Sequence, residues 1–264
     1  MKPNGIISFT TDFGDSDGYV GIMKGVIMSI HPTARLIDIS NQIPKHDVRA
    51  AAFLLQYSYH YFPVGTVHLA IVDPGVGSSR RPIAVETRDY FFIAPDNGIL
   101  QFIFQKEEIL NVVHIQNKKY MAENISATFH GRDIFSPAAA HLSKGLSINK
   151  LGTQISDFET ANITSPIIDS EKIIGSIVYI DHFGNLITNI PGDLLYGKSF
   201  SLTFSGHKIE KLTESYSRGL QSQPCAIIGS SGYLEIAVNQ QSAEQLLNAA
   251  IGDRISIFLN ENGD

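Results

Sequence analysis

The chain has 264 residues, of which 43% are hydrophobic and 17% charged, and its 20 basic and 26 acidic residues give a formal net charge of −6. This composition is typical of a soluble globular protein and excludes a disordered or membrane-embedded chain. The negative net charge disfavours nucleic acid as a partner. A length well above about 150 residues favours one large domain or two moderate ones, and we expect two.

Three features of the sequence predict where the protein works. A single cysteine, Cys225, cannot form an intramolecular disulfide, which is typical of a reducing compartment. The apolar run that follows Met1–Gly5 is too short for the core of a signal peptide. No run of about 18 apolar residues is present that would span a membrane. We therefore expect a cytoplasmic protein with no membrane partner.

The first half of the chain alternates β-type runs with helical patterns. In chain order the predicted elements are strand Gly5–Thr10, helix Tyr19–Ile30, strand Arg35–Ile39, helix Asp47–Tyr61, strands Thr66–Val72, Ile83–Glu86 and Tyr90–Ala94, a short helix opened by Asp96-Asn97-Gly98, strand Asn111–Ile115 and helix Arg132–Leu142. This alternation predicts an N-terminal α/β domain over residues 1–155. We expect its sheet to be mostly parallel, with helices on both faces.

The pattern changes after residue 155. A polar stretch without periodicity, residues 156–170, predicts a linker. Beyond it lie β-type runs and a single helical pattern: Lys172–Ile180, Ser199–Phe204, Pro224–Gly229, Tyr233–Val238, the helix Ser242–Ala250, and Arg254–Leu259. Residues 171–264 are therefore predicted to form a smaller C-terminal domain, a β-barrel.

Three polar segments of the first domain occupy the places where open α/β sheets bind ligands. They are the acidic segment Thr10–Asp17, the turn Asp73–Arg81, and Thr128–Asp133 before the last helix. Each has a purely structural alternative, because a strand-end aspartate commonly caps a turn or a helix, and His130 alone is compatible with a packing role.

Sequence motifs for nucleotide binding and for metal binding are absent. The glycines Gly75 and Gly77 do not continue into a dinucleotide-binding fingerprint, and no phosphate-binding loop with a Gly-Lys-Ser/Thr sequence follows them. The chain also lacks His-x-His and His-Glu-x-x-His motifs, which argues against a catalytic metal.

In the second domain, Tyr179–Asn189 concentrates polar side chains after a hydrophobic run. The segment is compatible with a bulged hairpin alone. However, Phe183 offers a stacking face and Asn185 an amide that both donates and accepts, a combination that suits an adenine ring. A comparable loop, Gly229–Asn239, follows.

Taken together and in this order, six motifs resemble the adenosine-forming S-adenosyl-L-methionine hydrolases, which are related to fluorinating and chlorinating enzymes that act on the same substrate. The motifs are Thr11–Gly14, Val72–Gly77, Ala94–Gly98, Phe129–Asp133, Asp181–Asn185 and Ser231–Ala237. They extend over almost the whole chain and both predicted domains. Each motif alone is weak, whereas six in register are specific.

The resemblance implies that water attacks the ribose C5′ of S-adenosyl-L-methionine, giving adenosine and L-methionine, without a cofactor or a metal. It also implies a homotrimer with active sites at the subunit interfaces. The family's hydrolytic triad falls on Asp73, Arg80 and His130, although the adjacent Arg81 leaves a one-residue alternative open. The implied substrate contacts are Asp12 for the ribose, Phe183 and Asn185 for adenine, Asp17, Asp181 and Ser230 for methionine, and Phe129, Ser231 and Asn239 as further lining residues.

Two other functions compete with hydrolysis. The first is halogen transfer, but the halogenating relatives carry a Tyr where Asp73 stands, and the fluorinating ones a Ser where Gly131 stands. The second is a nucleoside-binding module without turnover, which needs the stacking and diol contacts but not Asp73 together with His130. Within the hydrolase interpretation, Asp73 and His130 are both candidates for the group that takes the proton from water.

Overall fold

The chain divides into two compact units, Met1–Asn162 and Ile163–Asp264, and the computed structural model describes residues 1–160 and 165–259. Part of the predicted linker, 161–164, and the last five residues of the predicted second domain lie outside the described residues. Two residues near the end of the predicted linker form a strand. There β8 (Ile167–Ile168) pairs with β9 (Lys172–Ile180), since consecutive β-branched residues favour an extended, paired backbone.

A seven-stranded sheet forms the centre of the N-terminal unit, in the order β2-β1-β3-β5-β4-β6-β7. Its strands are β1 (Ile6–Thr11), β2 (Arg35–Ser40), β3 (Val67–Ile71), β4 (Pro82–Thr87), β5 (Phe91–Pro95), β6 (Ile109–Ile115) and β7 (Gly152–Gln154). Five strands run in one direction, while β4 and β7 run against them. The connection between β4 and β5 is only Arg88–Tyr90, and so short a connection joins antiparallel strands alone.

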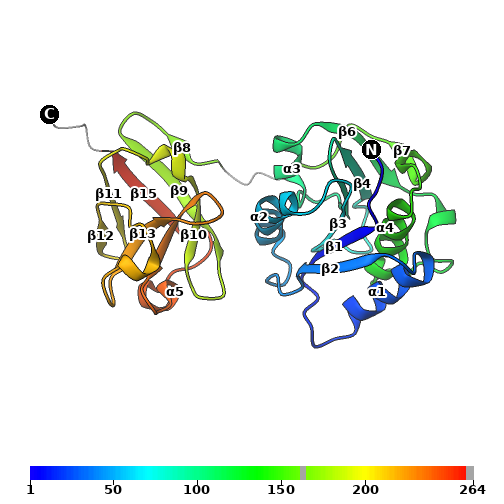
Figure 1. The fold of residues 1–264 in the computed structure, drawn as a ribbon, viewed down its shortest axis with the longest axis horizontal. Coiled ribbons are helices and arrows are strands. Elements are labelled where there is room, and N and C mark those ends of the chain that lie inside the picture. Colours follow the sequence, from blue (N-terminus) through cyan, green and yellow to red (C-terminus); the bar gives the residue numbers. More distant parts are fainter. Residues whose placement is uncertain (161–164, 260–264) are drawn as a thin grey trace. The chain divides into compact units, whose positions relative to one another are not determined.

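Helices cover both faces of this sheet, as predicted (Figure 1). They are α1 (Tyr19–Ile30), α2 (Val48–Ser58), α3 (Gln101–Lys106) and α4 (Ser136–Ser143). Helix α1 packs against α4, and α2 packs against α3. The bounds of α1 are those predicted. Helix α2 begins after Asp47, whose side chain accepts a hydrogen bond from the Ala50 N–H at 2.9 Å and so caps the helix.

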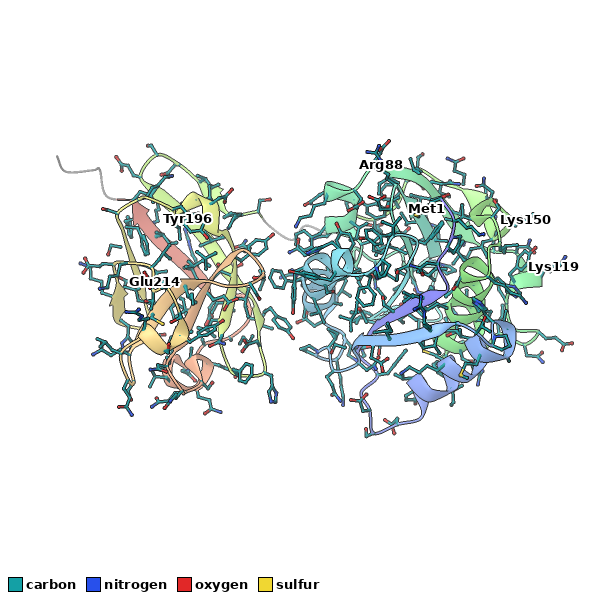
Figure 2. All side chains as sticks on the ribbon, viewed as in Figure 1. Met1, Arg88, Lys119, Lys150, Tyr196 and Glu214 are labelled. Atoms are coloured by element: carbon teal, nitrogen blue, oxygen red, sulfur yellow. The ribbon has the colours of Figure 1, made fainter. Side chains whose placement is uncertain are left out.

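One core cluster of the N-terminal unit lies between α1, α4 and the centre of the sheet, and side chains also fill the space on the face that α2 covers (Figure 2). Phe9 on β1, Leu69 on β3 and Met23 on α1 are fully buried in that cluster. The alanines of α4 are buried as well, which lets the helix approach the sheet closely. This packing holds the strands whose carboxyl ends lead into the polar segments.

One buried polar contact lies within the same sheet. His68 on β3 is fully buried, and its Nδ1 lies 2.7 Å from Oγ of Ser8 on β1. The ring stacks on Phe92 of β5. Burial lowers the pKa of His68 to about 3, because the protonated ring would lose its hydration there.

The C-terminal unit is an all-antiparallel sheet in the order β12-β11-β15-β9-β10-β14-β13. Its further elements are β10 (Leu186–Pro191), β11 (Phe200–Phe204), β12 (His207–Ile209), β13 (Pro224–Ile228), β14 (Tyr233–Val238), α5 (Ala243–Leu247) and β15 (Arg254–Leu259). Leu212, just after β12, bridges to Ala226 on β13, so the two ends of the order come together. The result is a nearly closed barrel, which confirms the predicted fold class. Among the described residues, no helix is long and apolar enough to cross a membrane.

Candidate active site

Asp73 and Arg80 form a bidentate ion pair at the carboxyl edge of the first sheet. Asp73 lies two residues beyond β3, and Arg80 lies two residues before β4. Arg80 Nε donates to Asp73 Oδ1 at 2.8 Å and to Oδ2 at 2.9 Å, and one terminal nitrogen of the guanidinium also donates to Oδ2. Both side chains are more than nine-tenths buried, at 8% and 7% exposure. Arg81 faces a different partner, Asp96, so the structure pairs Asp73 with Arg80.

His130 completes this group. Its Nδ1 lies 2.7 Å from the same terminal nitrogen of Arg80. Because a guanidinium can only donate, Nδ1 accepts, and the neutral ring carries its proton on Nε2. Burial lowers the pKa of His130, and the positive charge of Arg80 lowers it further. The contacts and the pKa therefore agree on a neutral imidazole near pH 7.

A cavity of about 280 Å³ opens beside the three residues. Five of the predicted site residues line it: Asp12, Asp17, Asp73, Phe129 and His130. Arg80 is not a lining residue but contacts two of them, Asp73 and His130. These residues come from the ends of β1 and β3 and from the turn before α4, so the fold gathers segments that are 120 residues apart in the sequence.

Aromatic rings form one wall of this cavity. Phe129 makes edge-to-face contacts with Tyr19, at 5.1 Å between ring centroids, and with Phe13, at 6.0 Å. Opposite charges are also present, because Lys45 and Asp12 both line the cavity. Asp12 Oδ2 accepts a hydrogen bond from the backbone N–H of His46 at 2.9 Å, which fixes the carboxylate and leaves further acceptor capacity for a ligand.

Phe13, Val76 and Thr128 also line the cavity and lie within the three predicted polar segments, whereas Tyr19, Lys45 and His46 line it from outside those segments and were not predicted. Lys45 and His46 follow β2, which is parallel to β1 and ends at the same edge of the sheet. The signal that would have found them is therefore the polar loop after β2, read by the same rule as the loops after β1 and β3.

A second cavity, of about 490 Å³, lies within the C-terminal unit. Two predicted adenine contacts line it, Phe183 and Asn185, together with Tyr216, Val238, Gln240, Gln241 and Ser242. Phe183 is 75% exposed, as expected of a ring available for stacking. Gly184 between them has φ +81°, and a Cβ there would lie 2.1 Å from Ser242 Oγ, so only glycine permits this close approach.

Asp181 organises the loop that carries these two residues. Its Oδ1 accepts hydrogen bonds from the N–H groups of Phe183 and Asn185, each at 2.9 Å, and its Oδ2 accepts from Asn185 Nδ2. The segment is also a hairpin between β9 and β10 with an irregular register at Ile187. The bulged-hairpin alternative thus describes its backbone, while the exposed ring and the adjacent cavity remain for a ligand.

The other predicted residues of this unit lie near β14. Ser230 and Ser231 form the turn between β13 and β14. Asn239 follows β14 and donates from Nδ2 to the Gly219 carbonyl at 3.1 Å. None of the three lines the cavity beside Phe183. Tyr216, which was not predicted, does line that cavity and donates to the buried Glu235 at 2.7 Å.

Possible metal ligands are not assembled at either cavity. Within residues 1–160 and 165–259, no three His, Cys, Asp or Glu side chains are grouped so that they could hold a metal ion. The acidic segment Asp12–Asp17 is therefore not gathered into a ligand cluster, although three of its six residues are aspartates.

Comparison with known proteins places this architecture in a family. Residues 7–152 match the family model of the SAM hydroxide adenosyltransferase N-terminal domain, and residues 175–256 match that of its C-terminal domain. A crystal structure of an uncharacterized conserved protein from Thermotoga maritima matches with a TM-score of 0.89 and 36% identity, covering 95% of this chain and 99% of that one.

Curated relatives agree with these matches. The (R)-S-adenosyl-L-methionine hydrolase of Salinispora tropica is 34% identical, covering 97% of this chain and 99% of its own length. The enzyme of the same name from Methanocaldococcus jannaschii is also 34% identical, covering 96% and 95%. A fluorinase from an Actinoplanes species is more distant, at 26% identity over 97% and 99% of the two chains. The chain therefore belongs to the SAM hydroxide adenosyltransferase family.

Proposed function

We propose that this protein hydrolyses S-adenosyl-L-methionine to adenosine and L-methionine. The observation that carries the proposal is the contact of Asp73, Arg80 and neutral His130 at a cavity that Asp12 also lines. A module that only binds a nucleoside has no need of a buried ion pair joined to a histidine at the cavity wall. The hydrolase names of the relatives at 34% identity support the same activity.

The chemistry requires help for the nucleophile only. Sulfur leaves as a neutral thioether when the C5′–S bond breaks, because it keeps the electron pair of that bond, and no general acid is needed. The oxygen of water forms the new bond to C5′ and loses a proton. General-base assistance to such a step contributes about 10²–10⁴-fold, and holding water in line with the breaking bond adds to it.

We assign to Asp73 the role of accepting the proton that the attacking water loses. His130 Nδ1 already accepts from Arg80 and Nε2 carries the ring proton, so the neutral imidazole has no free lone pair for a proton from water. His130 instead donates from Nε2 and orients the water oxygen. Asp73 Oδ1 accepts one hydrogen bond from Arg80 and keeps a second lone pair for the water proton.

Substrate binding falls to other residues. Asp12 accepts the two hydroxyls of the ribose, and Asp17 favours the cationic end of the substrate. Phe129 belongs to the aromatic wall of the same cavity. In the C-terminal unit, Phe183 stacks on adenine and Asn185 bonds its edge, while the methionine end and the remaining lining are assigned to Asp181, Ser230, Ser231 and Asn239.

The assembly we propose is a homotrimer in which active sites form at subunit interfaces, and the protein works in the cytoplasm without a cofactor or a metal. We expect its binding partner to be a small-molecule substrate. Light scattering tests the assembly, and a monodisperse, fully active monomer would contradict it.

The activity is tested directly by incubating the protein with S-adenosyl-L-methionine and separating the products by chromatography. The expected products are adenosine and methionine in equal amounts. Saturable binding of the substrate without either product would replace the hydrolase by a binding module. A His130→Ala variant serves as the matched control, because it removes the Arg80 contact while leaving Asp12 in place.

A further inference from the structure

The loop that carries Asp73 and Arg80 is held at both ends by two consecutive residues after β5. Asn97 Nδ2 donates to the carbonyl of Val72, the residue before Asp73, at 2.8 Å. Asp96 N donates to the carbonyl of Arg81, the residue after Arg80, at 2.8 Å. This follows from the topology, since β5 lies between β3, where the loop begins, and β4, where it ends. Neither residue lines the cavity.

Asp96 also binds the side chain of Arg81. Arg81 Nε lies 3.0 Å and one terminal nitrogen 2.7 Å from Asp96 Oδ2. The carboxylate is 3% exposed, and its other oxygen accepts from the Glu159 N–H at 2.8 Å. A buried carboxylate with these partners is fully satisfied, so Asp96 fixes Arg81 firmly.

The sequence contains two adjacent arginines and a nearby Asp73, and nothing in their chemistry distinguishes the two guanidinium groups. In the structure the two arginines have different carboxylate partners: Arg80 binds Asp73, whereas Arg81 binds the buried Asp96 and the exposed Asp157. Only Arg80 reaches His130 as well. In the observed arrangement, Arg81 is bound elsewhere and Arg80 alone contacts both other members of the proposed hydrolytic group.

We propose that Asp96 is a positioning residue of the active site, which binds Arg81 and thereby reserves Arg80 for Asp73 and His130. The expected effects on kcat rest on the proposed hydrolase function. The expected contacts of Arg80 and Arg81 do not depend on activity. It gives a role to the segment Ala94–Gly98, none of whose residues lines the cavity.

The first test compares Asp96→Asn with the wild type. The neutral amide binds Arg81 more weakly and leaves it with the exposed Asp157 as a carboxylate partner, so Arg81 can compete with Arg80 for Asp73. We expect kcat to fall by about 10–100-fold, the size of effect that a small misplacement of catalytic groups produces, with KM changed less than threefold. Asp157→Asn is the matched control. Asp157 also binds Arg81 but is 79% exposed, so its replacement should leave kcat within twofold.

The second test separates positioning from a merely structural role. In the double variant Asp96→Asn, Arg81→Gln no second arginine competes for Asp73, so kcat should recover at least tenfold from the single variant. If Asp96 served only to stabilise the loop, the double variant would be as impaired as the single one. Equal kcat in the two variants, or an unchanged kcat in Asp96→Asn, overturns the proposal.

A crystal structure of Asp96→Asn reports the partner of Asp73 whether or not the protein hydrolyses its substrate. We expect Arg81 to contact Asp73, or Arg80 to lose its contact with His130. An unaltered pair of Arg80 with Asp73 and His130 would overturn the inference. A wild-type protein that produces no adenosine would instead overturn the proposed function, so the two failures are distinguishable.

Discussion

His130 accepts a hydrogen bond from Arg80 through Nδ1, at 2.7 Å. The direction of this bond determines the protonation of the ring, because an imidazolium has no lone pair to offer a guanidinium. It also makes the arrangement sensitive to acid. Protonation of His130 would place two cations in contact where one donor and one acceptor now meet.

We therefore predict an acid limb in the pH profile of kcat/KM that lies below the ordinary histidine pKa of about 6.5. The pKa of His130 is lowered by burial and by Arg80, so the ring stays neutral at pH 7 and activity is lost as the pH falls through the lowered pKa. The measurement is a profile between pH 4.5 and 8. His130→Gln, which does not titrate, should be slower and lack this limb. A rate that increases below pH 6.5 would show that the imidazolium is the active form.

Replacing Asp73 and replacing Asp12 should have different kinetic effects. Asp73→Asn removes the group assigned to the water proton, so kcat should fall about 10²–10⁴-fold with little change in KM. Asp12→Asn weakens the hold on the ribose diol, and KM should increase as well. Steady-state kinetics on both variants makes the comparison. Were kcat of Asp73→Asn equal to that of the wild type, the assignment of Asp73 would be wrong.

Halide should not replace water as the nucleophile. A bare carboxylate about 4 Å from an anion costs roughly 4 kcal/mol at an effective dielectric of about 20. Arg80 screens part of this charge. Even half of this energetic penalty would still slow attack by the halide about 30-fold. Gly131 has no hydroxyl to donate to the anion, and a side chain there would meet Met23 Sδ at 3.0 Å.

In concentrated chloride or fluoride the product should therefore be adenosine, with no 5′-halogenated nucleoside detected by chromatography. The assay must also run in reverse, with 5′-chloro-5′-deoxyadenosine and methionine, because an unfavourable equilibrium would hide the forward reaction. Formation of S-adenosyl-L-methionine in the reverse assay would favour the halogenase assignment.

Removal of divalent metals should leave the activity unchanged. The proposed step uses a carboxylate, a neutral imidazole and a guanidinium, and the leaving thioether needs no Lewis acid. The check is turnover before and after dialysis against excess EDTA. Loss of turnover that is restored by one divalent ion, and not by dialysis against buffer alone, would contradict the metal-free mechanism.

Mild acid should also destabilise the N-terminal unit through His68. With a folded pKa of about 3 and an ordinary value of 6.5, the unfolded chain binds a proton between these values that the folded chain does not. Stability therefore falls as the pH decreases through this window, by about 2 kcal/mol from this group at pH 5. Urea unfolding at pH 7 and pH 5 measures the difference, which should be about 2 kcal/mol smaller in His68→Gln. Equal pH dependence in both proteins would remove His68 as the cause.

Much of the fold could be predicted because local patterns and burial agree. Helix α1 stops two residues before Pro32, and the strands of the first sheet are short apolar runs separated by turns. Strand β10 and the direction of β4 could not be predicted in the same way. Strand β10 lies in a segment rich in polar residues. The direction of β4 depends on the length of its connection to β5, and the periodicity of apolar residues carries no information about that length.

For the site, strand ends located Asp12 and Asp73, because the carboxyl edge of a parallel sheet gathers the loops that follow its strands. The choice between Arg80 and Arg81 could not be made from the sequence, since it depends on which carboxylate lies beside each side chain. His46 could have been found from the polar loop after β2 by the same rule. Tyr216 could not, because it reaches its cavity from a segment without any motif.

The turn that follows His130 has a consequence for how this activity can be lost or acquired. Gly131–Phe135 is a π-helical turn, in which the Ser136 N–H bonds to the Gly131 carbonyl five residues before it, and such turns hold one residue more than an α-helix needs. Deleting one residue there would make the turn a regular α-helical continuation of α4. The residues just before the turn would then be rotated by about 100° around the helix axis. His130 would then leave Arg80 without any change in side-chain chemistry. The step between binding the substrate and cleaving its C5′–S bond can thus consist of a single residue.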